Sequence, residues 1–151
     1  MHVTARADYA ARAVIELAAR LPAGATRQEI ARSQQIPGKF LEAILGDLRR
    51  AGILEAHRGA TGGYRLVADP VRITLADVIR VAEGPLAAVR GMPPEDVDYP
   101  GSAAALANVW IAVRASLRDV LEATTIADVL AKQLPEHVES LLARPDSWAR
   151  R

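Results

Sequence analysis

The 151-residue sequence predicts a mainly α-helical chain with one small β-hairpin, and three observations support this fold class. Apolar residues recur at helical spacing over most of the chain. Aromatic residues make up only 4% of it, so the core must consist of Ala, Leu, Val and Ile, which favours helices over a β-sandwich. Two short β-prone segments flank a glycine-rich connection, which is typical of a hairpin.

Capping signals and breakers set the limits of each element. Capping patterns begin at Thr26, Thr74 and Thr125, and Pro37 suits the start of another helix. Gly52 is placed to end that helix in a left-handed conformation. The sequence predicts helices over about 4–20, 27–34, 38–50, 75–83, 103–122 and from 126 to Pro135, with strands over 53–57 and 64–67.

These elements group into four parts along the chain. Residues 1–83 hold two short helices with a tight joint followed by a basic hairpin, the order of a winged helix-turn-helix domain. Residues 84–101 contain three glycines and four prolines, and so long a loop is a candidate sensor region. Residues 102–132 are the predicted dimerisation helices, and 133–151 form a C-terminal tail.

Charge is distributed unevenly between the two halves. Residues 1–83 contain 12 basic and 9 acidic residues, a net charge of +3, whereas residues 84–151 contain 7 and 9, a net charge of −2. The N-terminal half is therefore expected to face a polyanion. No apolar run is long enough to span a bilayer, so we expect a cytoplasmic protein without membrane contact. No pairing of nucleophile and base supports catalysis, so an enzyme is not expected.

The polar side of the predicted 38–50 helix suits the major groove of DNA. Ala43 lets the backbone approach base edges, and the Glu42 carboxylate can accept a hydrogen bond from a cytosine amino group. Lys39, Arg49 and Arg50 lie near the helix ends, where phosphates would be met. The alternative is an ordinary amphipathic helix with a solvated face.

The hairpin favours the DNA-binding interpretation. Arg58 lies at its tip, where an arginine can enter a narrow minor groove, although a plain glycine-rich hairpin remains the alternative. The polar side of the 38–50 helix and the basic hairpin lie next to each other in the sequence, and each suits contact with the same duplex. Together they predict DNA binding. Farther along, apolar residues form a nearly heptad stripe typical of paired helices. The predicted dimerisation residues are Leu106, Val109, Trp110, Val113, Leu117, Val120 and Leu121.

Several segments closely resemble the Rrf-type (IscR/NsrR/CymR-like) family of bacterial winged helix-turn-helix regulators. They are Asp8-Tyr9-Ala10, the pattern from Ile36 to Leu54, and Arg58-Gly59 with Gly62 to Leu66. The resemblance covers about residues 1–132. It implies a homodimer that reads a palindromic operator in double-stranded DNA, with Phe40 and Glu42 in the major groove and Arg58 in the minor groove. The full predicted DNA-binding set is Thr26, Arg27, Gln28, Lys39, Phe40, Glu42, Ala43, Arg49, Arg50, Arg58, Thr61, Gly62, Gly63 and Tyr64.

The sequence also departs from that family. The family's sensor motif is three cysteines in the loop corresponding to about 86–101, and this chain has no cysteine. The missing thiolates therefore predict no cofactor, and in particular no cysteine-ligated iron–sulfur cluster, and no residue is assigned to a metal site. Lys39 stands where the family often has a small hydroxyl residue, and Ala60-Thr61 replaces a Gly/Pro-rich step. These changes bear on the operator sequence.

The signal remains open between three alternatives. A small-molecule effector could bind near 84–110, with Asp8, Trp110 and Met92 as candidate ligand-binding residues. Control could instead come from protein level or a partner protein, as in cluster-free family members. A non-cysteine metal site could use Asp8, His57 or the acidic loop residues.

A rival class of protein is a winged helix that is kept for contacts with other proteins. The predicted function is a dimeric, sequence-specific regulator of transcription, with repression as the expected outcome.

Overall fold

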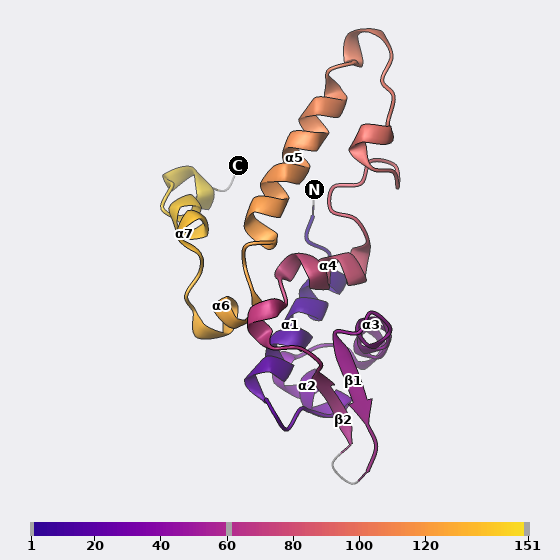
Figure 1. The fold of residues 1–151 in the computed structure, drawn as a ribbon, viewed down its shortest axis with the longest axis vertical. Helices are drawn as coiled ribbons and strands as arrows, with labels where there is room; N and C mark the ends of the chain where they lie inside the picture. The colour runs from indigo at the N-terminus through magenta and orange to yellow at the C-terminus, as the bar shows by residue number, and fades with distance from the viewer. Residues whose placement is uncertain (1, 60–61, 150–151) are drawn as a thin grey trace.

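A computed structural model describes residues 2–59 and 62–149, and Figure 1 shows it. Within these residues the predicted fold class is confirmed, because helices dominate and the strands form a two-stranded antiparallel sheet. The helices and strands are α1 (Ala5–Ala19), α2 (Arg27–Gln34), α3 (Gly38–Arg50), β1 (Leu54–His57), β2 (Gly63–Leu66), α4 (Leu75–Glu83), α5 (Leu106–Leu121), α6 (Ile126–Ala131) and α7 (Glu136–Leu142).

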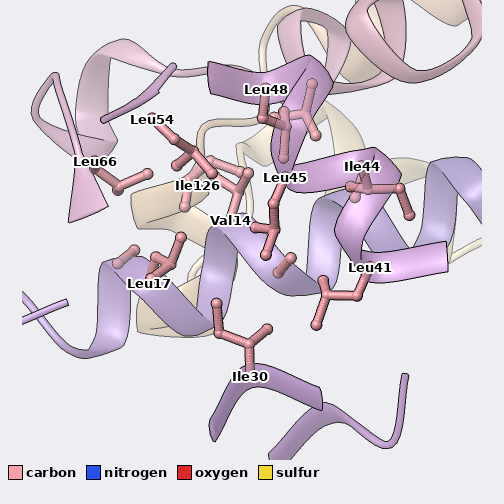
Figure 2. Packing of buried hydrophobic residues seen from close by; sticks show 14 of the residues in the cluster. Val14, Leu17, Ile30, Leu41, Ile44, Leu45, Leu48, Leu54, Leu66 and Ile126 are labelled. Carbon is pink, nitrogen blue, oxygen red and sulfur yellow. The ribbon is translucent and has the colours of Figure 1, made fainter. Parts of the chain in front are cut away.

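The core of the N-terminal domain surrounds α1. Ala10, Ala13, Val14 and Leu17 follow one another at helical spacing and are fully buried. They lie where α3, α4 and α6 pack against α1. Figure 2 shows side chains from α1, α2, α3, α6 and both strands converging on one cluster. This single core fixes α3 relative to the rest of the domain.

The turn between α2 and α3 explains why two short helices meet here. A capping box starts α2: the Thr26 hydroxyl accepts from the Glu29 backbone N–H, and the Glu29 carboxylate accepts from the Thr26 backbone N–H. Gln35 ends α2 in the left-handed conformation, and its φ is 53°. Pro37 is the N-cap residue of α3. Three residues thus connect α2 to α3, in agreement with the tight joint that the sequence predicts.

The hairpin is anchored to the start of α2. Strands β1 and β2 pair in a register that places Leu54 opposite Leu66 and His57 opposite Gly63. Ala25 adds a bridge beside β2, since the backbone N–H groups of Ala25 and Tyr64 each donate to the other's carbonyl. These two hydrogen bonds join the wing to the start of the helix-turn-helix.

Helix α6 corrects the predicted division of the chain. The sequence places it in the dimerisation part, 102–132, but Ile126 is fully buried in the N-terminal core and α6 packs against α1. The Ile126 backbone N–H also donates to the Ile73 carbonyl. The chain thus returns to the winged domain after α5. In addition, α6 ends at Ala131, where Lys132 is left-handed, and does not continue to Pro135.

Helix α5 projects from the winged domain, with the segment after α4 running beside it (Figure 1). It begins at Leu106, three residues later than predicted, because Gly101–Ala103 form a separate 3-10 turn. None of the sixteen described residues of α5 is buried. No helix in the described part of the chain has the length and apolar content needed to cross a bilayer.

Candidate nucleic-acid interface

Helix α3 presents one buried side and one exposed side. Its buried residues are Leu41, Ile44, Leu45 and Leu48. The predicted reading residues Lys39, Phe40, Glu42, Ala43, Arg49 and Arg50 are all exposed. Anchoring by four buried side chains holds the exposed side at a fixed orientation, which is what a helix needs to fit a groove.

Phe40 is held by an aromatic neighbour on α1. Its side chain is 51% exposed and meets the Tyr9 ring edge-on, with the ring centroids 6.0 Å apart. The Arg12 guanidinium lies 5.6 Å from the centre of the same Tyr9 ring and pairs with Asp8 at 3.1 Å. The i, i+3 spacing of Tyr9 and Arg12 predicts that these two side chains meet on α1. The contact of Tyr9 with Phe40 could not be predicted, because it depends on how α1 and α3 pack.

Glu42 and Arg27, both predicted to contact DNA, contact each other. The Arg27 Nη1 donates to the Glu42 Oε2 at 2.6 Å. This ion pair joins the first residue of α2 to α3 across the turn. The two residues are fifteen apart in sequence, so neither motif nor spacing predicted the contact.

The other cations of α3 divide into paired and unpaired groups. Asp47 pairs with both Arg50 and Arg6, so Arg50 is tethered along its own helix. Within residues 2–59 and 62–149, no carboxylate lies at ion-pair distance from Lys39 or Arg49. Lys39 and Arg49 are therefore available for phosphate oxygens at opposite ends of the exposed side.

The start of α2 combines exposed residues with a helix cap. Arg27 and Gln28 are exposed, but the Thr26 hydroxyl is engaged with Glu29 as donor and acceptor. The hydrogen bonds from the Thr26 backbone and side chain hold the pKa of Glu29 below its usual range. Thr26 thus serves as the cap of α2, and Gln28 is more available than Thr26 for contact with DNA.

In the wing, Arg58 is exposed beyond the end of β1, and no carboxylate of the described residues lies at ion-pair distance from it. The Gly62 backbone N–H donates to the Gly59 carbonyl, so it serves the turn. The Tyr64 backbone N–H donates to the Ala25 carbonyl, and the Tyr64 ring packs on the core. Gly62 and Tyr64 are thus structural residues here. Thr61 lies outside the described residues.

Gly63 meets the strongest steric constraint in the wing. A Cβ built there would lie 2.5 Å from the Ala25 carbonyl oxygen. Because backbone atoms cannot yield as a flexible side chain would, only glycine allows β2 to lie this close to the start of α2. The predicted DNA-binding residue Gly63 is therefore placed as the contact between wing and helix-turn-helix.

The arrangement of exposed helix, turn and anchored wing matches known proteins. A model of the Rrf2 family, described as an iron-dependent transcriptional regulator, matches residues 3–132. The chain belongs to the Rrf2 family. A Mycobacterium tuberculosis (strain H37Rv) protein, provisionally named an HTH-type transcriptional regulator, is 44% identical over 142 residues, which cover 93% of this chain and 88% of the relative.

Solved structures of Rrf2-family regulators share the fold. The structure of CymR, the global cysteine regulator of Bacillus subtilis, has a TM-score of 0.74 and 32% identity, covering 87% of this chain and 98% of CymR. IscR of T. potens has a TM-score of 0.72 and 29% identity, covering 99% and 97%. The resemblance drawn from sequence is confirmed, and this Rrf2-family chain is a transcriptional regulator rather than an enzyme.

The family description names iron, but the residues of this Rrf2-family chain do not fit a cysteine-ligated cluster. Iron–sulfur clusters are held mainly by Cys thiolates, and the sequence contains none. Among the described residues, no three His, Asp or Glu side chains gather closely enough to hold a metal ion. In the loop before α5, Glu95 pairs with Arg114 at 2.6 Å, and this hydrogen bond lowers the pKa of Glu95.

An open cavity of about 560 Å³ lies between the N-terminal segment, the end of α4 and the C-terminal half of α5. Ile79, Leu86, Leu117 and Leu121 supply apolar walls. Glu83 adds a carboxylate, which accepts a hydrogen bond from the Thr4 hydroxyl at 2.5 Å. This volume falls in the range of small-molecule sites.

The three predicted ligand-binding residues do not line this cavity. Asp8 is exposed and paired with Arg12, and Met92 is exposed in the loop. Trp110 is half-buried, and its Nε1 is buried without a hydrogen-bond partner among the described residues. The cavity could not be predicted from the sequence, because its walls come from segments about eighty and thirty residues apart.

The predicted dimerisation residues all lie on α5 and all remain accessible. Val109 is exposed, and the other six are half-buried: Leu106, Trp110, Val113, Leu117, Val120 and Leu121. Two of the half-buried residues, Leu117 and Leu121, also border the cavity. Helix α5 contacts α4 and the loop before it, but none of its described residues is buried, so the stripe keeps accessible apolar surface.

Proposed function

We propose that this Rrf2-family regulator is a homodimeric, sequence-specific DNA-binding repressor. Helix α3 would enter the major groove, and Arg58 of the wing would enter the adjacent minor groove. The observation that carries this proposal is the exposed side of α3, anchored by four buried residues and set beside a wing tied to the same turn. Repression would follow from covering a promoter, and the chromosomal target makes the cytoplasm the site of action.

The homodimer is supported by the apolar stripe of α5. A two-fold pairing of these helices would bury side chains that a single chain leaves accessible. It would also present two α3 helices to one duplex, spaced by about one helical turn, roughly 34 Å, so the operator would be a palindrome.

The DNA-binding proposal is tested with duplexes selected from a random library by the purified chain. Arg58→Ala should raise the Kd of the selected duplex at least about fivefold, the equivalent of about 1 kcal/mol, because a groove contact is lost. Arg144→Ala, in the exposed tail segment after α7, is the matched control and should leave the Kd unchanged. Fluorescence anisotropy gives both values. An unchanged Kd for Arg58→Ala would contradict minor-groove insertion.

We further propose that the cavity beside α4 and α5 binds a small, largely apolar effector. The cavity touches both the winged domain and the helix proposed to pair, so an occupant could alter how the two are held together. A metabolite panel would be screened for compounds that raise the melting temperature. Ala88→Phe, which fills the cavity, should abolish the shift, and Ala115→Phe on α5 should retain it. A shift that survives Ala88→Phe would rule this site out.

We also propose that the regulator works without an iron–sulfur cluster. Chain purified without oxygen should be colourless and contain no iron by elemental analysis, because it has no thiolate to bind a cluster. Stoichiometric iron would contradict this proposal.

A further inference from the structure

We propose that Arg27 is a positioning residue that sets the base preference of α3 by holding the Glu42 carboxylate. This inference rests on the proposed function, in which Glu42 meets a base edge. It departs from the prediction that Arg27 acts independently as a DNA contact.

The geometry of the Arg27–Glu42 pair suits a positioning role for Arg27. Arg27 Nη1 donates to Glu42 Oε2 at 2.6 Å, a short charge-assisted hydrogen bond. Within the described residues, Oε1 of the same carboxylate accepts no hydrogen bond. One oxygen is thus anchored while the other can accept from a base amino group. Glu has three side-chain torsions, so anchoring one oxygen limits the directions in which the other can point.

The negative charge of Glu42 also favours a positioning role for Arg27. A carboxylate on a helix that enters the major groove approaches phosphate groups of the same sign. Among the described residues, Arg27 is the only cation at ion-pair distance from Glu42. Lys39 lies three residues before Glu42 on α3, but among the described residues it is not at ion-pair distance from this carboxylate. Arg27 is therefore the group that offsets this repulsion.

The exposure of both side chains separates a positioning role for Arg27 from a structural one. The side chains of Arg27 and Glu42 are 43% and 71% exposed. Exposed ion pairs contribute little to folding, so replacing either partner should leave the domain folded. An effect of Arg27 on base preference would then arise from the pair itself, and melting temperatures of all variants verify that the fold is retained.

The test compares wild type, Arg27→Gln, Glu42→Gln and the double variant, each used to select duplexes from a random library. The base pair read by Glu42 is the position where Glu42→Gln changes the selected sequence. We expect wild type to bind the selected duplex at least about fivefold more tightly than a duplex changed at that base pair. Arg27→Gln should abolish this ratio at the same base pair, and the double variant should show no further loss.

Arg49→Gln is the matched control, because Arg49 lies on the same exposed side of α3 without a carboxylate partner among the described residues. It should weaken binding to both duplexes equally and, because a homodimer loses Arg49 from both chains, reduce the slope of log affinity against log salt by about 1.8. Arg27→Gln behaving in this way, with the ratio preserved, would overturn the proposal and make Arg27 a phosphate contact.

Two other outcomes are distinguishable from that one. If wild type is selective but Glu42→Gln changes no base preference, base reading by Glu42 fails and the inference fails with it, while DNA binding stands. If wild type shows no selectivity at any base pair, the proposed sequence-specific function and this inference both fail.

Discussion

Gly63 joins the wing to the helix-turn-helix at the scale of one residue. The Ala25 carbonyl oxygen occupies the space where a side chain at position 63 would begin. Gly63→Ala should therefore lower the free energy of unfolding by about 1–3 kcal/mol, through strain or loss of the Ala25 bridge. Chemical denaturation measures the change.

Gly38→Ala is the control for that substitution. Gly38 is the first residue of α3, and a Cβ there would meet no atom within 4 Å. Alanine is a better helix former than glycine, so this variant should be as stable as wild type or slightly more stable. Equal destabilisation by both substitutions would show that the close approach at Gly63 is not the cause.

Sequence reasoning succeeded for residues whose position follows from helical periodicity. The exposed Lys39, Glu42 and Arg49 follow from the apolar pattern on the other side of the same helix. It could not separate a glycine that approaches DNA from one that approaches its own backbone, because both need a missing side chain. The Arg27–Glu42 pair was equally out of reach, since it depends on how two helices cross.

Helix α6 offers the clearest prediction at the scale of elements. Ile126→Ala should destabilise the protein by about 2–5 kcal/mol, because it opens a cavity in the core beside α1. Leu130→Ala on the same helix is the control; Leu130 is exposed, so little stability should be lost. Thermal or denaturant unfolding compares them. Equal, small effects would place α6 outside the winged domain.

Capping boxes at α2 and α6 make stability depend on acid pH. The Thr26 backbone lowers the pKa of Glu29, and the Thr125 hydroxyl lowers the pKa of Asp128. A carboxylate with a lowered pKa in the folded state stabilises above its unfolded pKa and loses that contribution as pH falls through the folded pKa. The melting temperature should therefore fall on acidification.

Glu29→Gln isolates one of these caps. Glutamine can keep the capping hydrogen bonds without a charge, so the melting temperature of this variant should vary less with pH than that of wild type. Glu139→Gln, in α7 and outside any capping box, should leave the pH dependence closer to wild type. A wild-type pH profile for Glu29→Gln would contradict the role of its ionised form.

The limits of most helices could be predicted because local signals set them. Thr26, Thr74 and Thr125 each cap the helix that the sequence assigned to them. The packing partner of α6 could not be predicted, because six apolar-rich residues do not reveal which surface buries them. The late start of α5 reflects a 3-10 turn that competes with the first helical turn.

At the scale of the whole molecule, the apolar stripe of α5 makes dimerisation testable. Val113→Glu places a charge in the stripe and should convert a dimer to a monomer in sedimentation experiments, with weaker binding to the selected duplex. Ala115→Glu, exposed and outside the stripe, should remain dimeric. A monomeric wild type, or a dimeric Val113→Glu, would contradict pairing through α5.

The salt dependence of DNA affinity separates a DNA-binding winged helix from one kept for protein contacts. Lys39, Arg49 and Arg58 from each of two chains would displace counterions from phosphates. If the winged helix binds DNA in this way, affinity for the selected duplex should fall by about 10³-fold between 50 and 200 mM salt. Weak binding that barely changes over this range would contradict it.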